Sequence, residues 1–157
     1  PHLLLFCHEG PWHKVDRIWT IRTDGSDLKL VHQRTMTMEI AGHEFWSADG
    51  KTVWYDLQTP RGEDFWVAGY NVETGKRIWY QWQRNEWSVH FNVSPDGKLF
   101  AVSREHGTFV LAAGSQFKQL AVNQLDDTSV FNATPAVSRG QLLLRSDRAL
   151  YCIGLRR

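Results

Sequence analysis

Two histidines stand at matching places in a repeated stretch of the chain. The first, His43, is followed by Ser47, Asp49, Gly50 and Lys51, and His90 is followed by the same four residue types at the same offsets, 47 residues further on. A histidine, with an unperturbed pKa of about 6.5, can accept a proton near neutrality or bind a divalent metal through a neutral ring nitrogen. The two positions are therefore candidates for a general base and for a metal ligand. Because equivalent strands of a repeated unit face one common region, we expect the two histidines to converge on one site.

Each candidate residue also has an ordinary structural role open to it. A histidine on an aromatic strand, as His43 is, can be hydrogen-bonded inside a sheet. Arg17 lies on a strand-like stretch, where an arginine is more often a solvated or ion-paired surface residue. A lone histidine such as His90 does not fix a metal, because a borderline divalent ion needs several protein ligands. From the residue types alone, both interpretations stay open.

Short strands and tight turns are the elements that must position these residues. Apolar residues alternate or run in fours and fives, and turn residues recur about every 8 to 12 positions, which is typical of antiparallel strands. A repeat period in the forties is typical of a β-propeller blade, a small sheet that stacks on its neighbours to bury its faces. The sequence therefore predicts an all-β fold, and specifically a partial β-propeller of about three and a half to four blades, each of four antiparallel strands.

The predicted strands fall into four groups within a single domain over residues 1–157. These groups are 3–7, 17–22 and 28–32; 43–46, 52–57, 65–70 and 76–80; 88–90, 99–102, 108–112 and 117–122; and a last group from 134 to 144. We expect the blades to meet near the turns at Gly50, Gly97 and Gly140. All eight tryptophans lie between Trp12 and Trp87, so residues 103–157 are predicted to form divergent propeller-like blades. Since a propeller needs at least about four blades, we expect a fragment, missing blades or self-association.

The composition indicates which classes of binding partner are not expected. The formal net charge of the chain is +1, and its charges are interspersed, so we expect no nucleic acid as a partner. The longest apolar run, Leu3 to Cys7, is far below the roughly 18 residues of a membrane-spanning helix, so we expect no membrane partner. Cys7 and Cys152 lie near opposite ends of the sequence, and we expect both to be free, buried thiols.

Several ordered motifs over residues 3–100 resemble oligogalacturonate lyase, a seven-bladed propeller enzyme of pectin breakdown. The motifs are Phe6-Cys7-His8-Glu9-Gly10-Pro11, Val15-Asp16-Arg17-Ile18-Trp19, His43-Glu44-Phe45-Trp46 with Asp49-Gly50, and Ser88-Val89-His90 with Asp96-Gly97. The stretch from residue 1 to 102 is assigned to lyase-like blades on this ground. The sequence pattern from Thr134 to Gly154 resembles a blade of a quinoprotein-type propeller.

The resemblance implies a polysaccharide lyase that cleaves short galacturonides by metal-assisted β-elimination. It implies that His43 is the base that abstracts a proton, that Arg17 binds the substrate carboxylate, and that His90 is one ligand of a divalent metal, typically Mn²⁺. The family completes its metal site with a Gln-x-x-His-x-His motif in a later blade, and this sequence has no such motif. We therefore expect an incomplete metal site. The alternative is a non-catalytic β-propeller module that binds a sugar or another partner on its face.

Overall fold

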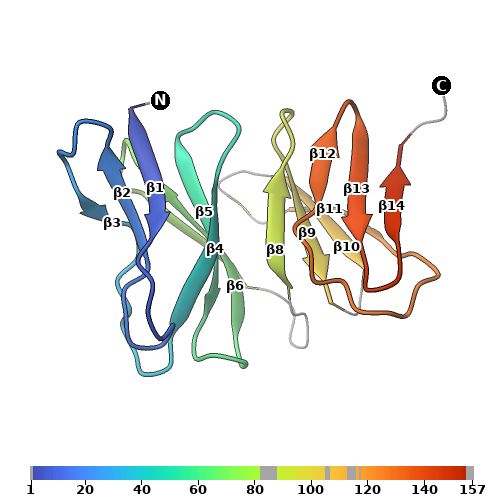
Figure 1. Ribbon diagram of the computed structural model, residues 1–157, viewed down its shortest axis with the longest axis horizontal. Helices are drawn as coiled ribbons and strands as arrows, with labels where there is room; N and C mark the ends of the chain where they lie inside the picture. Colours follow the sequence, from blue (N-terminus) through green and yellow to red (C-terminus); the bar gives the residue numbers. More distant parts are fainter. Residues whose placement is uncertain (1, 82–87, 105–106, 113–115, 117, 155–157) are drawn as a thin grey trace. The chain divides into compact units, whose positions relative to one another are not determined.

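The chain folds entirely into β-strands and turns over the residues that the structure describes. A computed structural model describes residues 2–81, 88–104, 107–112, 116 and 118–154, and these form fourteen strands and no helix (Figure 1). Accordingly, this part of the chain has no helix with the length and apolar character to cross a membrane. The all-β prediction is confirmed.

The strands build four antiparallel sheets in which chain order is also sheet order. The first two sheets lie in the unit Pro1–Arg84 and the other two in the unit Asn85–Arg157. In the first unit the sheets are β1 (Leu3–Cys7), β2 (Ile18–Arg22) and β3 (Lys29–Leu30), followed by β4 (Ile40–Trp46), β5 (Thr52–Gln58), β6 (Phe65–Asn71) and β7 (Arg77–Gln81). In the second unit they are β8 (Ser88–Val93), β9 (Lys98–Ser103), β10 (Thr108–Ala112) and β11 (Gln119–Asn123), followed by β12 (Ala136–Ser138), β13 (Gln141–Arg145) and β14 (Leu150–Ile153).

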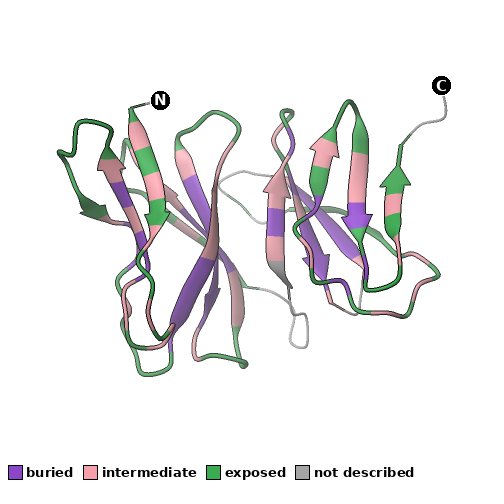
Figure 2. Ribbon diagram, in the orientation of Figure 1, coloured by how far each residue is buried: buried purple, intermediate pink, exposed green. Residues whose placement is uncertain are grey.

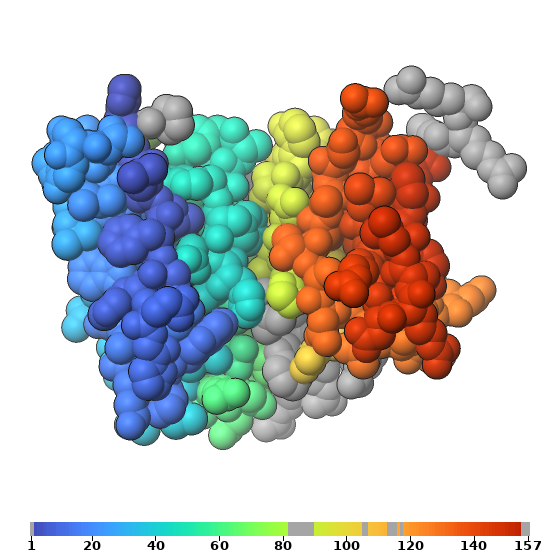
Figure 3. All heavy atoms as spheres, in the orientation of Figure 1, coloured from blue at the N-terminus to red at the C-terminus, as the bar shows by residue number. Residues whose placement is uncertain are grey.

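Strand β5 is the buried centre of the first unit. It pairs with β4 on one side and β6 on the other, and every residue from Val53 to Gln58 is buried (Figure 2). Its side chains Val53, Tyr55 and Leu57 pack in one cluster with Ile18 and Val31. Strand β1 lies at the surface of this unit, in dark blue in Figure 3, with exposed apolar side chains along it. A polar residue on β5 is consequently held away from water by the strands on either side.

The second unit has a smaller described core. Val102, Phe131 and Leu144 are buried together, with Leu125 and Tyr151 packed against them. Strand β11 is exposed along its whole length, and the buried side chains described for the third sheet lie on β9, on β10 and, at Phe91, on β8.

The repeated turns are hairpins within sheets. Gly50, Gly97 and Gly140 join the first strand to the second in three successive sheets, with φ of 69°, 76° and 75°. These left-handed values suit glycine, which has no Cβ to clash. In the first copy, Asp49 accepts hydrogen bonds from the Ser47 hydroxyl and the Lys51 amide, at 2.6 and 3.0 Å. The prediction of a repeated turn is confirmed, but its interpretation as a junction between blades is wrong, because each turn lies inside one sheet.

The cysteines are both free thiols, and the expectation that both are buried is wrong. Cys7 is half-buried on β1, and Cys152 is exposed on β14, the described edge of its sheet. An edge strand leaves one face of its side chains open to solvent, which the local apolar pattern does not reveal.

Candidate active site

His43 lies at a β-bulge between β4 and β5. The register of the pair shifts between Gly42 and Phe45, so that His43 and Glu44 face the single residue Tyr55. The backbone of His43 has a φ of 50°, in the left-handed region that residues with a Cβ seldom adopt. Bulges of this kind re-aim side chains and are frequent beside active sites.

A buried carboxylate holds the imidazole of His43. Its Nδ1 lies 2.7 Å from Oδ1 of Asp56, a residue of β5 with 2% of its surface exposed. The amide of Gln58 donates a longer hydrogen bond, 3.5 Å, to the other oxygen of Asp56. The carboxylate therefore has one strong partner, His43, and one weaker one.

This pairing makes His43 more basic than an ordinary histidine. Burial works to lower the pKa of His43, but the hydrogen bond to Asp56 and the negative charge of Asp56 outweigh it and raise that pKa. Glu44 adds to the rise in the pKa of His43, whereas Arg17 works against it. His43 is therefore suited to accept a proton near neutral pH.

Trp12 contacts both Arg17 and His43. The guanidinium carbon of Arg17 lies 4.0 Å from the centroid of the Trp12 ring, and the rings of Trp12 and His43 are 5.3 Å apart. The tryptophan also packs closely on the backbone of β4, where a Cβ added at Gly42 would come within 2.8 Å of its ring. Glycine at this position lets Trp12 approach the bulge that carries His43.

Arg17 is buried but is not saturated by its partners. It is 6% exposed, yet its described partners are the carbonyl oxygen of Gly10 at 3.3 Å and the well-exposed carboxylate of Glu9 at 3.6 Å. Its buried Nε has no hydrogen-bond partner among the described residues. A guanidinium carries five N–H donors in a rigid fork that matches a carboxylate. Arg17 thus has donors to offer to an anionic ligand.

His90 lies on β8 in the second unit, and its convergence with His43 stays a prediction. Its Nδ1 is 3.5 Å from the hydroxyl of Thr134. Over residues 2–81, 88–104, 107–112, 116 and 118–154, no three His, Cys, Asp or Glu side chains are grouped to hold a metal ion. The described residues around His90 therefore do not form a complete metal site.

The sequence interpretation missed two residues of this site. The sequence does hold one indication of Asp56, which is an acidic residue inside the otherwise apolar and aromatic stretch 53–57 of a predicted strand. Such a residue needs a partner when it is buried. No sequence pattern pointed to Trp12, because it reaches the site from a loop that folds back over β4.

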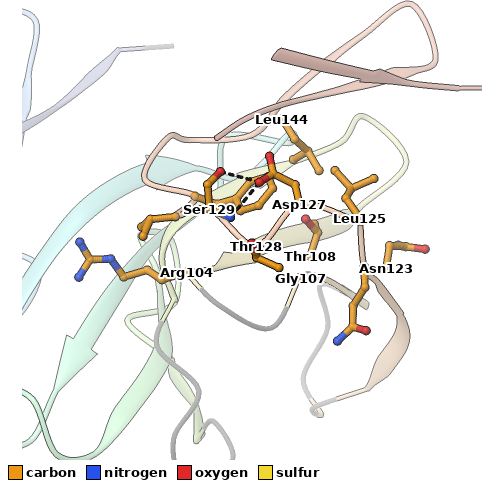
Figure 4. A pocket seen from close by; sticks show the side chains of 12 residues that line it. Arg104, Gly107, Thr108, Asn123, Leu125, Asp127, Thr128, Ser129 and Leu144 are labelled. Atoms are coloured by element: carbon orange, nitrogen blue, oxygen red, sulfur yellow. Dashed lines mark hydrogen bonds between the residues drawn. The ribbon is translucent and has the colours of Figure 1, made fainter. Parts of the chain in front are cut away.

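A separate pocket of about 470 Å³ lies in the second unit (Figure 4). Its carboxylate, Asp127, accepts hydrogen bonds from the amide and hydroxyl of Ser129 and from the hydroxyls of Ser146 and Tyr151, at 2.6 to 2.8 Å. Four donors occupy this carboxylate, and they tie the loop to the last hairpin. We assign Asp127 a structural role.

Comparison with curated proteins finds lyases of pectin fragments. The chain is 43% identical over 51 residues to the oligogalacturonide lyase of Pectobacterium atrosepticum and to the oligogalacturonate lyase of Dickeya dadantii. Each match covers 32% of this chain and 13% of the relative. No family model matches the chain.

Comparison with solved structures extends the similarity over nearly the whole chain. An oligogalacturonate lyase in complex with manganese matches 99% of this chain with a TM-score of 0.73 and 24% identity. The oligogalacturonate lyase of Vibrio parahaemolyticus matches 96% with a TM-score of 0.70 and 20% identity. The chain covers 46% and 45% of these two proteins, which is less than half of each. Its sequence and structural neighbours thus carry the name that the motifs indicated.

Proposed function

We propose that this chain carries the proton-abstracting part of an oligogalacturonate lyase site, which cleaves short galacturonides by β-elimination. The observation that supports it most is the contact of Trp12 with both Arg17 and His43, since a carboxylate-binding cation and a base lie on one aromatic ring. The relatives named oligogalacturonate lyase support the same substrate class.

The reaction sets three requirements on the site. The proton at C5 of the uronate lies α to the carboxylate and must go to a base. The electron pair of the C5–H bond becomes the C4–C5 double bond, and the C4–O bond breaks with its pair on the departing oxygen, which takes a proton from water. Negative charge builds up on the carboxylate meanwhile, so cations must stand beside it.

Arg17 and His43 meet two of these requirements. The guanidinium of Arg17 binds the uronate carboxylate through paired N–H donors and stabilises the charge that develops there. His43, with a pKa raised by Asp56, accepts the proton from C5. No covalent intermediate is needed.

We propose Mn²⁺ as the metal, since one solved relative contains manganese. A divalent ion would act as a Lewis acid on the uronate carboxylate. The residues that the structure describes do not fit a complete site, because His90 is accompanied by the Thr134 hydroxyl and by no group of three potential ligands. The steps above are therefore assigned to residues of this chain alone.

We also propose that each of the four sheets is a propeller blade. Two have four strands and two have three in the described residues, which agrees with three and a half to four blades. The predicted boundary near residue 102, between lyase-like and divergent blades, belongs to this proposal, as do further blades or self-association to close a ring.

A non-catalytic binding module is the second candidate. The lack of a described metal cluster favours it, since Arg17 and Trp12 could hold a uronate without turnover. The two candidates separate in one experiment on the full chain. Digalacturonate is added with and without manganese, and its binding is followed by calorimetry while the 4,5-unsaturated product is followed by ultraviolet absorbance. Product formation that stops in Arg17→Ala supports the lyase, and binding without product supports the module.

A further inference from the structure

His43 and His90 occupy equivalent positions, but the equivalent residues on the strands that follow them are of different types. In the first repeat, Asp56 of β5 stands 13 residues after His43 and lies 2.7 Å from its ring. In the second repeat the equivalent position, 47 residues after Asp56, is Ser103 of β9. Both first strands carry an irregular register near the histidine, after Gly42 and after Ser88. The shift spans His43 in the first repeat but precedes His90 in the second, where His90 pairs with Val102, so neither the place of the irregularity nor the carboxylate is the same.

We propose that Asp56 is a positioning residue that holds His43 with its Nδ1 proton toward the carboxylate, so that Nε2 accepts the proton of the substrate. Ser103 marks the second repeat as one that does not supply such a base. The identity of the substrate rests on the proposed function, whereas the tautomer of His43 does not.

The chemistry of the pair favours one tautomer. Burial raises the pKa of Asp56, and the hydrogen bond from His43 works to lower it. While the Asp56 carboxylate is ionised it accepts hydrogen bonds and donates none, so the 2.7 Å contact then needs a proton on Nδ1 of His43. In the neutral ring the basic lone pair then lies on Nε2. A neutral imidazole in water exchanges freely between its two tautomers, and the buried Asp56 removes that choice.

The residues around His43 restrict the orientation of its ring as well as the position of its proton. Trp12 lies against the ring at 5.3 Å, and the positive φ of 50° fixes the direction in which the side chain leaves the bulge. Strained backbone of this kind persists where the neighbouring structure holds it and is common at functional sites. The carboxylate and the tryptophan together leave the imidazole little freedom to turn.

The charges of Asp56, Glu44 and Arg17 act on His43, and they predict what removal of Asp56 would do. Asp56 and Glu44 favour the protonated ring, and Arg17 disfavours it. Asp56→Asn removes the nearest negative charge and leaves Arg17 in place. In Asp56→Asn, the imidazole of His43 should therefore titrate at a lower pH than in the unmodified chain.

The tautomer is tested by nitrogen NMR on the full chain labelled at histidine, with His43→Gln to assign the signal. We expect the neutral His43 to carry its proton on Nδ1, and the titration midpoint to fall by about one pH unit in Asp56→Asn. Asp56→Ser, which introduces the residue type of the second repeat, should do the same and serves if Asp56→Asn does not fold. Glu73→Gln makes the same charge change at an exposed site and should leave the signal in place. A proton on Nε2 in the unmodified chain, or an unchanged midpoint in both Asp56 variants, would overturn the proposal.

Lyase kinetics separate this inference from the proposed function. We expect Asp56→Asn to lower kcat by about tenfold or more with KM within about twofold, and to move the ascending limb of the pH profile to lower pH. If the unmodified chain forms no product, the proposed function fails while the NMR result still decides the positioning. If the chain is active and Asp56→Asn retains its kcat, the positioning role is wrong and the proposed function stands.

Discussion

The guanidinium of Arg17 lies over the ring of Trp12, with 4.0 Å between the guanidinium carbon and the ring centroid. This cation–π contact helps to hold a buried cation in place and needs no hydrogen bond from its N–H groups. Nη1 of Arg17 contacts Gly10 and Glu9, and its other N–H donors can be offered to a carboxylate. The ring of Trp12 is therefore as much a part of the proposed carboxylate-binding site as Arg17.

Replacing Trp12 should weaken uronate binding. A cation–π contact at a partly desolvated site contributes about 1 to 2 kcal/mol, so Trp12→Leu is expected to raise the dissociation constant for galacturonate about tenfold. Isothermal calorimetry measures this directly. Trp79→Leu is the matched control, since Trp79 packs on His32 and Trp66. Equal affinity in Trp12→Leu and the unmodified chain would show that the stacking does not hold Arg17 for the ligand.

The close approach of Trp12 to β4 should make Gly42 intolerant of a side chain. A Cβ at this position would lie 2.8 Å from the Trp12 ring, and overpacking of this kind typically destabilises by about 1 to 3 kcal/mol. We expect Gly42→Ala to lower the free energy of unfolding by that amount in urea titrations. Gly154→Ala is the control, because its nearest neighbour is the flexible Gln141 side chain at 3.1 Å. Equal stability of the two variants would contradict the packing described for Trp12.

A buried histidine–glutamate pair stabilises the loop between β3 and β4. His32 donates from Nε2 to Glu39 at 2.5 Å and lies 3.0 Å from the hydroxyl of Tyr55 through Nδ1. Glu39 is fully buried and also accepts from the amide and hydroxyl of Thr35, at 2.8 and 2.9 Å. Burial lowers the pKa of His32, so near neutral pH this contact is a hydrogen bond to a charged carboxylate. Such hydrogen bonds contribute about 1.5 to 3 kcal/mol, so Glu39→Gln should be destabilised by an amount in that range near neutral pH, whereas Glu73→Gln should be close to the unmodified chain.

The pH dependence of that loss follows from the pKa of Glu39. Burial works to raise this pKa, but the hydrogen bonds from Thr35 and His32 outweigh it, so the folded pKa lies below the ordinary value of 4.5. The unfolded chain then binds the proton more tightly, and the stabilising contribution of Glu39 is complete above pH 4.5 and is lost as pH falls through the folded pKa. The difference in unfolding free energy between the unmodified chain and Glu39→Gln should shrink below pH 4.5. If this difference in unfolding free energy grows on acidification, the pKa of Glu39 is not lowered in the folded chain.

Manganese should bind this chain weakly. A borderline divalent ion needs several protein ligands, and His90 is accompanied by no group of three in the residues that the structure describes. Titration followed by manganese paramagnetic resonance should give weak binding that is little changed in His90→Ala. Tight binding that disappears in His90→Ala would show that further ligands of this chain reach His90.

The sequence predicted the strands well because their cause is local. Alternating and aromatic residues over 52–57 specify a strand, and the turn at Gly50 specifies its hairpin; both are present in the structure. The resemblance to oligogalacturonate lyase, carried by short ordered motifs, is likewise confirmed by the comparisons.

The contacts of the site depend on register and on loops, which local patterns do not determine. The pairing of Asp56 with His43 depends on a bulge that shifts β4 against β5, and a sequence pattern does not locate that shift. The burial of Arg17 depends on Trp12, which arrives from a loop. For the same reason the residue type alone favoured a surface position for Arg17, which is buried, and the exposure of Cys152 was missed.

The central claim is that His43 removes the C5 proton of a uronate. It is tested most directly by the initial rate of formation of the 4,5-unsaturated product from digalacturonate, compared between the unmodified chain and His43→Ala under identical conditions with manganese. A general base contributes about a hundredfold or more, so we predict that His43→Ala lowers this rate by at least that factor while its thermal unfolding stays cooperative. Product formation at an undiminished rate in folded His43→Ala would contradict the assignment of the base.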